Sequence, residues 1–111
     1  MDMNQEVKSE DLTVGTYVLC VFKQTKSVFF QYFVGLVSKE EDEDGDLEIR
    51  FYRKVPNRIN QFYPKKNDIA SHSITDIQAI LLKPIYTGTT ERTQNIVQFP
   101  PRLSFGKIHV N

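Results

Sequence analysis

The residues best suited to hold a metal ion form the acidic run EEDEDGD, which begins at Glu40. Glu40, Asp42 and Asp44 have the spacing of the first carboxylates of an EF-hand calcium loop, and Gly45 stands where such a loop turns. The glutamate that an EF-hand needs at its last position is replaced by Phe51, and neither flank has helical periodicity. A solvated hairpin turn built on Asp-Gly explains the run better, so we expect no metal site.

Few residues could act as a nucleophile or a general base. Cys20 lies inside the apolar run YVLCVF, where a thiol usually behaves as a small buried hydrophobe. His72 lies in the segment SHS and His109 lies near the C-terminus, and neither forms a known catalytic pattern with Cys20. No Cys/His spacing indicates zinc, and no glycine-rich loop precedes a helix. We therefore expect neither an enzyme nor a bound cofactor.

Aromatic residues are concentrated in the first two thirds of the chain. Tyrosine and phenylalanine favour half-buried strand faces, and a row of them can also form a groove for a peptide or a cage for a cation. Phe33 and Phe51 belong to alternating apolar series, which favours a place in the core. The candidates for a ligand-binding aromatic face are Phe22, Phe29, Tyr32, Tyr52, Phe62 and Tyr63.

Basic residues cluster just after the acidic run. Interleaved with aromatic side chains, they could form a surface that binds phosphates and stacks bases. Alternatively, Arg50 and Arg53 pair with Glu48 and its neighbours as surface ion pairs of little energetic weight. The candidates for a nucleic-acid face are Arg50, Arg53, Lys54, Arg58, Lys65 and Lys66.

The aromatic and basic candidates are expected to lie on short β-strands. Leu47–Lys54 alternates cleanly between apolar and polar residues, and the neighbouring runs are rich in β-branched and aromatic residues. Gly35 inside a strand indicates a bend or a close backbone approach. The predicted strands are Tyr17–Phe22, Val28–Ser38, Leu47–Lys54, Arg58–Tyr63 and Ile80–Lys83.

The segments between the last of these strands are expected to be irregular. Residues 65–73 are predicted to be a loop, and Ser73–Ile77 a single helical turn capped by Ser73. Close spacing of five strands with almost no helix predicts an all-β fold, a small antiparallel five-stranded SH3-like barrel with a C-terminal extension. Residues 1–10 are expected to be a flexible arm, residues 11–86 the barrel, and residues 87–111 an extended tail partly docked on it.

The order of motifs resembles a Tudor-type or chromo-type barrel. Such domains open with a glycine before an apolar strand and continue with an aromatic-x-small-x-Val strand, an acidic turn and an aromatic-rich strand. The matching residues are Gly15, Phe33, Gly35, Val37, Ile49 and Phe51. Their cages bind methylated side chains, but this chain has no tryptophan, and Arg53-Lys54 follows Tyr52 where an acidic and glycine-containing pattern is usual.

A second resemblance concerns residues 59–84. It is similar to barrel domains at the ends of animal proteins derived from transposable elements, with Tyr63-Pro64, Asp68-Ile69, Asp76-Ile77 and a strand closed by Pro84. By analogy, this resemblance implies a nuclear or genome-defence setting.

Composition sets the remaining expectations. The 111 residues carry 14 basic and 14 acidic side chains, so the formal net charge is zero and does not imply bulk attraction to nucleic acid or membranes. One cysteine, a polar N-terminus and the absence of a long apolar stretch predict an intracellular protein without a membrane anchor.

Two functions remain open at this point. The first is a non-enzymatic protein-interaction module that binds a peptide or a partner protein through the aromatic face of the barrel. The alternative is a nucleic-acid or chromatin-associated module that uses the basic face, or a Tudor-like reader of methylated residues. The apolar, proline-interrupted stretch Ile96–Val110 is expected to dock in part on the barrel, and it could also occupy the aromatic groove, dock onto a neighbouring copy or bind another protein.

Overall fold

The computed structural model describes residues 7–23, 30–86, 95–100 and 110–111, and this part of the chain is almost entirely β-structure. Two single-turn 3₁₀ helices, η1 (Ser9–Asp11) and η2 (Ile74–Asp76), accompany the strands. The strands are β1 (Tyr17–Lys23), β2 (Phe30–Lys39), β3 (Asp46–Lys54), β4 (Gln61–Ser73), β5 (Ile77–Ile80), β6 (Ile85–Tyr86) and β7 (Val97–Gln98).

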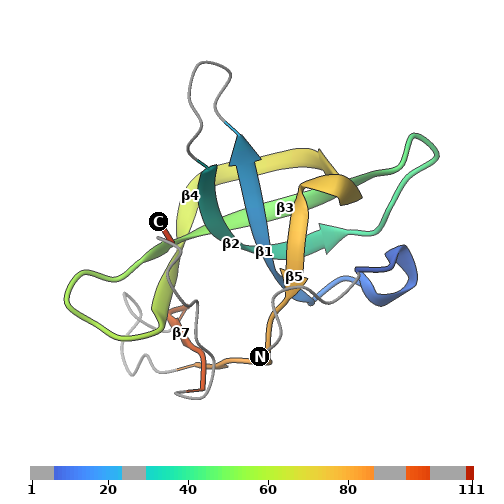
Figure 1. Cartoon of the computed structure of the whole chain (residues 1–111). Helices are drawn as coiled ribbons and strands as arrows, with labels where there is room; N and C mark the ends of the chain where they lie inside the picture. The colour runs from blue at the N-terminus through green and yellow to red at the C-terminus, as the bar shows by residue number, and fades with distance from the viewer. Residues whose placement is uncertain (1–6, 24–29, 87–94, 101–109) are drawn as a thin grey trace.

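The strands form one curled antiparallel sheet with the order β5-β1-β2-β3-β4-β7-β6. Strands β1 to β4 follow one another as hairpins, and β5 returns to pair with β1. Strand β7 pairs with the start of β4 and with β6 (Figure 1). The all-β antiparallel fold is confirmed. The expected number of five strands is wrong, because β6 and β7 are two-residue strands that are too short to show a periodic pattern.

Strand β4 differs most from the sequence prediction. It does not end at Pro64 but runs from Gln61 to Ser73, so the loop expected over residues 65–73 is wrong. Tyr52 pairs with Pro64 and Arg50 pairs with Ile69, so two steps along β3 correspond to five along β4. The bulge explains why the sequence did not predict this part of the strand, because the extra residues interrupt the alternation of side chains by which a strand is recognised.

Asn67 is the residue that makes the bulge in β4 possible. It has a φ of 61°, a left-handed conformation that asparagine tolerates better than most residues. The bulge redirects the neighbouring side chains, so that Asp68 reaches Arg53 on β3.

The predicted helical turn is confirmed as η2. The Ser73 hydroxyl accepts a hydrogen bond from the Thr75 amide at 3.3 Å, which satisfies one of the free donors at the start of the turn. Strand β5 begins directly afterwards at Ile77, three residues earlier than expected. In the described part of the chain, no helix is long and apolar enough to span a membrane.

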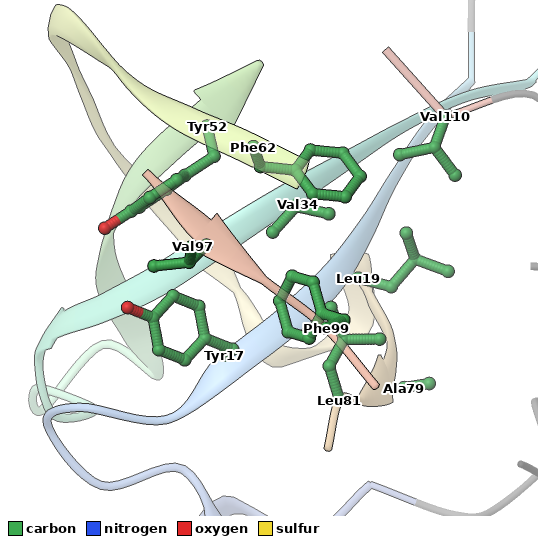
Figure 2. Packing of buried hydrophobic residues seen from close by; sticks show 10 residues of the cluster. All are labelled: Tyr17, Leu19, Val34, Tyr52, Phe62, Ala79, Leu81, Val97, Phe99 and Val110. Atoms are coloured by element: carbon green, nitrogen blue, oxygen red, sulfur yellow. The ribbon is translucent and has the colours of Figure 1, made fainter. Parts of the chain in front are cut away.

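Apolar side chains cover both faces of the sheet. The tail-side cluster is shown in Figure 2 and is named for the C-terminal residues Val97, Phe99 and Val110 that pack into it. Phe99 is fully buried, with its ring 5.7 Å from Tyr17 and 5.8 Å from Phe62. Its amide donates to the Asn60 carbonyl at 2.9 Å, so residues 97–99 are held by backbone bonds as well as by packing.

The recess-side cluster lies on the opposite face. Its buried members are Leu12, Val18, Cys20, Val37, Leu47, Ile49, Phe51 and Ile77. The close backbone approach expected at Gly35 is present here, because a Cβ at Gly35 would lie 2.5 Å from the Ile49 Cγ2 atom and 3.7 Å from the Cys20 sulfur. Only a glycine allows β2 and β3 to approach so closely at this point.

Candidate functional site

The acidic run forms a turn in which one carboxylate, that of Asp42, binds backbone amides. The Asp42 carboxylate accepts hydrogen bonds from the amides of Asp44 at 2.9 Å and Asp46 at 3.0 Å. Gly45 has a φ of 81°, which suits glycine and closes the β2–β3 hairpin. Among the described residues, no three His, Cys, Asp or Glu side chains are grouped as a metal site would require.

The possible nucleophile and base are both occupied by structural contacts. Cys20 is completely buried, and burial raises the pKa of its thiol to about 12. The His72 ring packs 4.8 Å from Phe22 and 5.3 Å from Phe51, and its Nδ1 atom lies 3.3 Å from the Asp76 carboxylate. His109 lies outside the described residues.

The six aromatic candidates do not form one face. Tyr52 and Phe62 are 4% and 1% exposed and belong to the tail-side cluster, where burial also raises the pKa of the Tyr52 hydroxyl. Tyr32 packs partly against the same cluster, and its carbonyl accepts from the Asn111 amide at 3.0 Å. These three side chains are therefore committed to packing.

The other three candidates have different surroundings. Phe22 packs against the recess-side cluster, Tyr63 is 41% exposed, and Phe29 lies outside the described residues. Side chains alternate between the two faces of a strand, so aromatic residues that are adjacent in sequence cannot all line one surface.

A recess of about 310 Å³ opens where the recess-side cluster meets the surface; we call it the aromatic recess. It is lined by Phe22, Gln31, Phe33, Phe51, Arg53, Asp68, Ala70 and His72. The rings of Phe22 and Phe33 lie 5.4 Å apart, and Phe51 lies 5.7 Å from Phe22. The apolar walls thus come from β1, β2 and β3, and the polar rim comes mainly from β3 and β4.

Most of this lining was missed by the sequence prediction. Phe33 and Phe51 were expected in the core, and they do pack on it, but they also form walls of the recess. Asp68 and Ala70 fell in the predicted loop. The alternation of Phe33 with Gly35 and of Phe51 with Ile49 places these rings on the same face as Phe22, and this signal could have identified them.

Arg53 lies between the aromatic recess and a second recess. Its guanidinium lies 4.6 Å from the centre of the Phe33 ring, and its Nη2 atom donates to the Asp68 carboxylate at 3.2 Å. Its Nη1 atom is buried and has no hydrogen-bond partner among the described residues. The Arg53 side chain thus covers an aromatic wall while one of its donors is unsatisfied.

The second recess, which we call the basic recess, has a volume of about 490 Å³. It is lined by Phe33, Arg53, Lys54, Tyr63, Lys65 and Asn111. Three of the six basic candidates therefore meet in one place, together with an exposed tyrosine. Arg50, Arg58 and Lys66 are exposed and do not line it.

The acidic turn lies far from the basic recess. Strand β3 runs from Asp46, beside the acidic turn, to Lys54, at the basic recess, and the two turns that flank β3 extend from opposite ends of the sheet (Figure 1). Eight steps along a strand correspond to about 26 Å, well beyond the screening length of physiological salt. The acidic side chains therefore do not neutralise the three cations, and Lys39 rather than Arg53 pairs with Glu48.

Comparison of the chain with protein-family models, with curated proteins and with solved structures found no match. A functional assignment therefore rests on the geometry of the two recesses.

Proposed function

We propose that this chain is a non-enzymatic protein-interaction module that binds an extended peptide in the aromatic recess. The observation that carries the proposal is the meeting of three phenylalanine rings in a concave surface with a small polar rim. Ligand sites have this composition, because apolar walls supply burial while a few polar groups fix orientation. A recess of about 310 Å³ suits one or two side chains rather than a whole folded partner.

The backbone of β4 supports a peptide ligand. Beyond Phe62, its pairing in the described part of the chain is with β3 alone. A strand with one neighbour leaves amide and carbonyl groups to which an extended peptide can add. Ala70 and His72 line the recess from this same strand, so a peptide beside β4 would bring its side chains to the aromatic walls.

The barrel type is part of the proposal. The order of the first five strands, the long β2–β3 hairpin and the short helical turn before β5 are consistent with an SH3-like, Tudor-like barrel. A reader of methylated cations needs an aromatic surface that is free to contact the cation, and this chain differs from such a reader at that point. Here Arg53 already lies over the Phe33 ring, and its charge opposes a second cation.

The second candidate is association with nucleic acid, which goes with a nuclear, chromatin-associated setting. It is favoured by the meeting of Arg53, Lys54 and Lys65 beside the exposed ring of Tyr63. Such binding would weaken steeply as salt is added.

A selection experiment tests the peptide proposal. A bead-bound library of random ten-residue peptides with blocked termini is incubated with the labelled protein and with its Ala70→Trp variant. Ala70 is an exposed residue that lines the recess, so tryptophan there fills the site without removing a core side chain. Ser71→Trp is the matched control, because Ser71 is exposed and adjacent but lies outside the recess lining.

We expect the wild type and Ser71→Trp to retain the same family of peptides, rich in large apolar side chains. Ala70→Trp is expected to lose them while keeping the wild-type midpoint of urea unfolding. Retention of no sequence family by the wild type, or equal retention by Ala70→Trp, would contradict the proposal.

A further inference from the structure

We infer that the basic recess binds an acidic side chain of the same peptide, so that the ligand is an extended peptide with a carboxylate close to its apolar anchor. This inference rests on the proposed function and adds the chemical class of the partner. The two recesses share Phe33 and Arg53 as lining residues, so they form adjoining parts of one surface.

The positive charges in the basic recess favour the binding of an anion. Within the described residues, Lys54 and Lys65 line it without an ion pair, and none of its lining side chains carries a carboxylate. The carboxylate of Asp68 is bonded to Arg53 at 3.2 Å and lines the aromatic recess instead. Arg53 therefore has a counter-ion, whereas the positive charges of Lys54 and Lys65 are not paired within the described residues, and a bound anion would relieve the repulsion between them.

The guanidinium of Arg53 provides a second, independent indication. Its Nη2 atom is satisfied by Asp68, whereas the buried Nη1 atom has no acceptor in the described part of the chain. Leaving a buried charged donor unsatisfied is unfavourable, and a carboxylate can accept from two nitrogens of a guanidinium at once. A small reorientation of the Arg53 side chain, which is already partly exposed, would present Nη1 to a ligand.

Strand geometry sets the spacing in the ligand. In an extended peptide, residues i and i+2 point to the same side and are about 6.6 Å apart. Since the recesses share a wall at Phe33, a peptide with an apolar residue at one position and Asp or Glu two positions away would fill both.

Several observations favour an acidic peptide over a nucleic acid. The net charge is zero, and three of the six basic candidates lie outside the basic recess, so these six do not form one long cationic track. The adjoining recess has three phenylalanine walls, which suit an apolar side chain and offer nothing to a phosphate backbone. The single-partner stretch of β4 offers both amide donors and carbonyl acceptors, which match an extended peptide backbone better than the phosphates of a nucleic acid, because phosphates only accept.

The test uses the same bead library with a charge-reversed double variant, Lys54→Glu with Lys65→Glu. The matched control is Arg50→Glu with Arg58→Glu, which changes the net charge equally at two exposed basic residues outside the recess. One peptide retained by the wild type is then synthesised with a fluorophore. A second form carries the matching amide, Asn or Gln, in place of the acidic residue. The Kd of each peptide is measured for each protein. A 12-nucleotide single-stranded DNA is titrated beside it.

We expect the wild-type sequences to be enriched in Asp or Glu two positions from a large apolar residue. The charge-reversed variant should bind the peptide at least tenfold more weakly, the amide form of the peptide should lose a similar factor, and the control should stay within about threefold. If the peptides that depend on Ala70 are not enriched in acidic residues, this inference is overturned and the proposed function stands. Absence of any Ala70-dependent family would overturn both. Tighter binding of the DNA than of every peptide, lost on charge reversal, would assign the basic recess to nucleic acid instead.

Discussion

Substitution of Gly35 by alanine tests the packing beneath the aromatic recess. Gly35 lies on β2 two residues from Phe33, and an added Cβ would be 2.5 Å from the Ile49 Cγ2 atom, where ordinary carbon contacts are about 3.5–4.0 Å. Ile49 is fully buried and β-branched, so it has few rotamers into which it can retreat. Overpacking of this kind costs about 1–3 kcal/mol.

A gain in the unfolded state opposes this cost, because replacing glycine by alanine restricts the unfolded chain by about 0.4–1 kcal/mol. The steric term is the larger, so we expect Gly35→Ala to lower the free energy of unfolding by about 1–2 kcal/mol. With an m value of about 1.5 kcal/mol/M, the midpoint of urea unfolding then falls by about 1 M.

A double-mutant cycle with Ile49→Ala separates this clash from other effects. Ile49→Ala removes the Cγ2 atom and by itself costs about 2–5 kcal/mol through the cavity it leaves. In that background the new Cβ has room, so Gly35→Ala should cost less than about 0.5 kcal/mol. A Gly35→Ala protein as stable as the wild type, or an equal cost in both backgrounds, would refute this reasoning.

Three further predictions concern the tail, the bulge and the buried thiol. Phe99→Ala is expected to lower the free energy of unfolding by about 3–5 kcal/mol in urea titrations, and a loss below about 1 kcal/mol would mean that the tail does not complete the core. Asn67→Val is expected to destabilise by about 1–2 kcal/mol and Asn67→Gly much less, because φ is 61°; equal stability of the two variants would contradict a left-handed residue there. The folded-state pKa of Cys20, about 12, lies above its unfolded value, so its contribution to stability is complete below about pH 9 and is lost as the pH rises towards 12. Cys20→Ala should therefore show a shallower alkaline loss of stability than the wild type, while Ellman's reagent at about pH 8 should label the native wild-type thiol far more slowly than the unfolded one.

The regular part of the fold could be predicted from the sequence. The alternation of Leu47, Ile49 and Phe51 has the period of a strand, and this local signal survives folding because one face is buried along its whole length. Ser73 predicted the helical turn because a capping side chain binds a backbone amide only two residues away, so this signal is also local in the sequence.

The rest of the fold depends on contacts that sequence periodicity does not record. Asn67 introduces a bulge that interrupts alternation in β4, and β7 is a strand only because β4 and β6 provide its pairing partners. Tyr52 in the tail-side cluster shows the same limit of sequence prediction. Its residue type suited a binding face, but Tyr17 and the neighbouring Phe99 cover that side of the sheet.

The candidate site could be predicted only in part. Arg53, Lys54 and Lys65 were identified as basic candidates, but which cations meet depends on the pairing of Arg53 with Tyr63 and on the bulge. Asp68 could not have been placed beside Arg53 without the register of β3 and β4, because 15 residues separate them in sequence.

The most direct test of the proposed binding surface is a titration of the ¹⁵N-labelled protein with one peptide selected on the beads. We expect the largest amide shifts at Phe33, Arg53 and Ala70, where β2, β3 and β4 meet around the two recesses, and unchanged amides at the acidic turn. Shifts confined to the exposed strand Ile85–Tyr86, with the amides of the recesses unmoved, would contradict the account and place recognition at the β6 edge of the sheet.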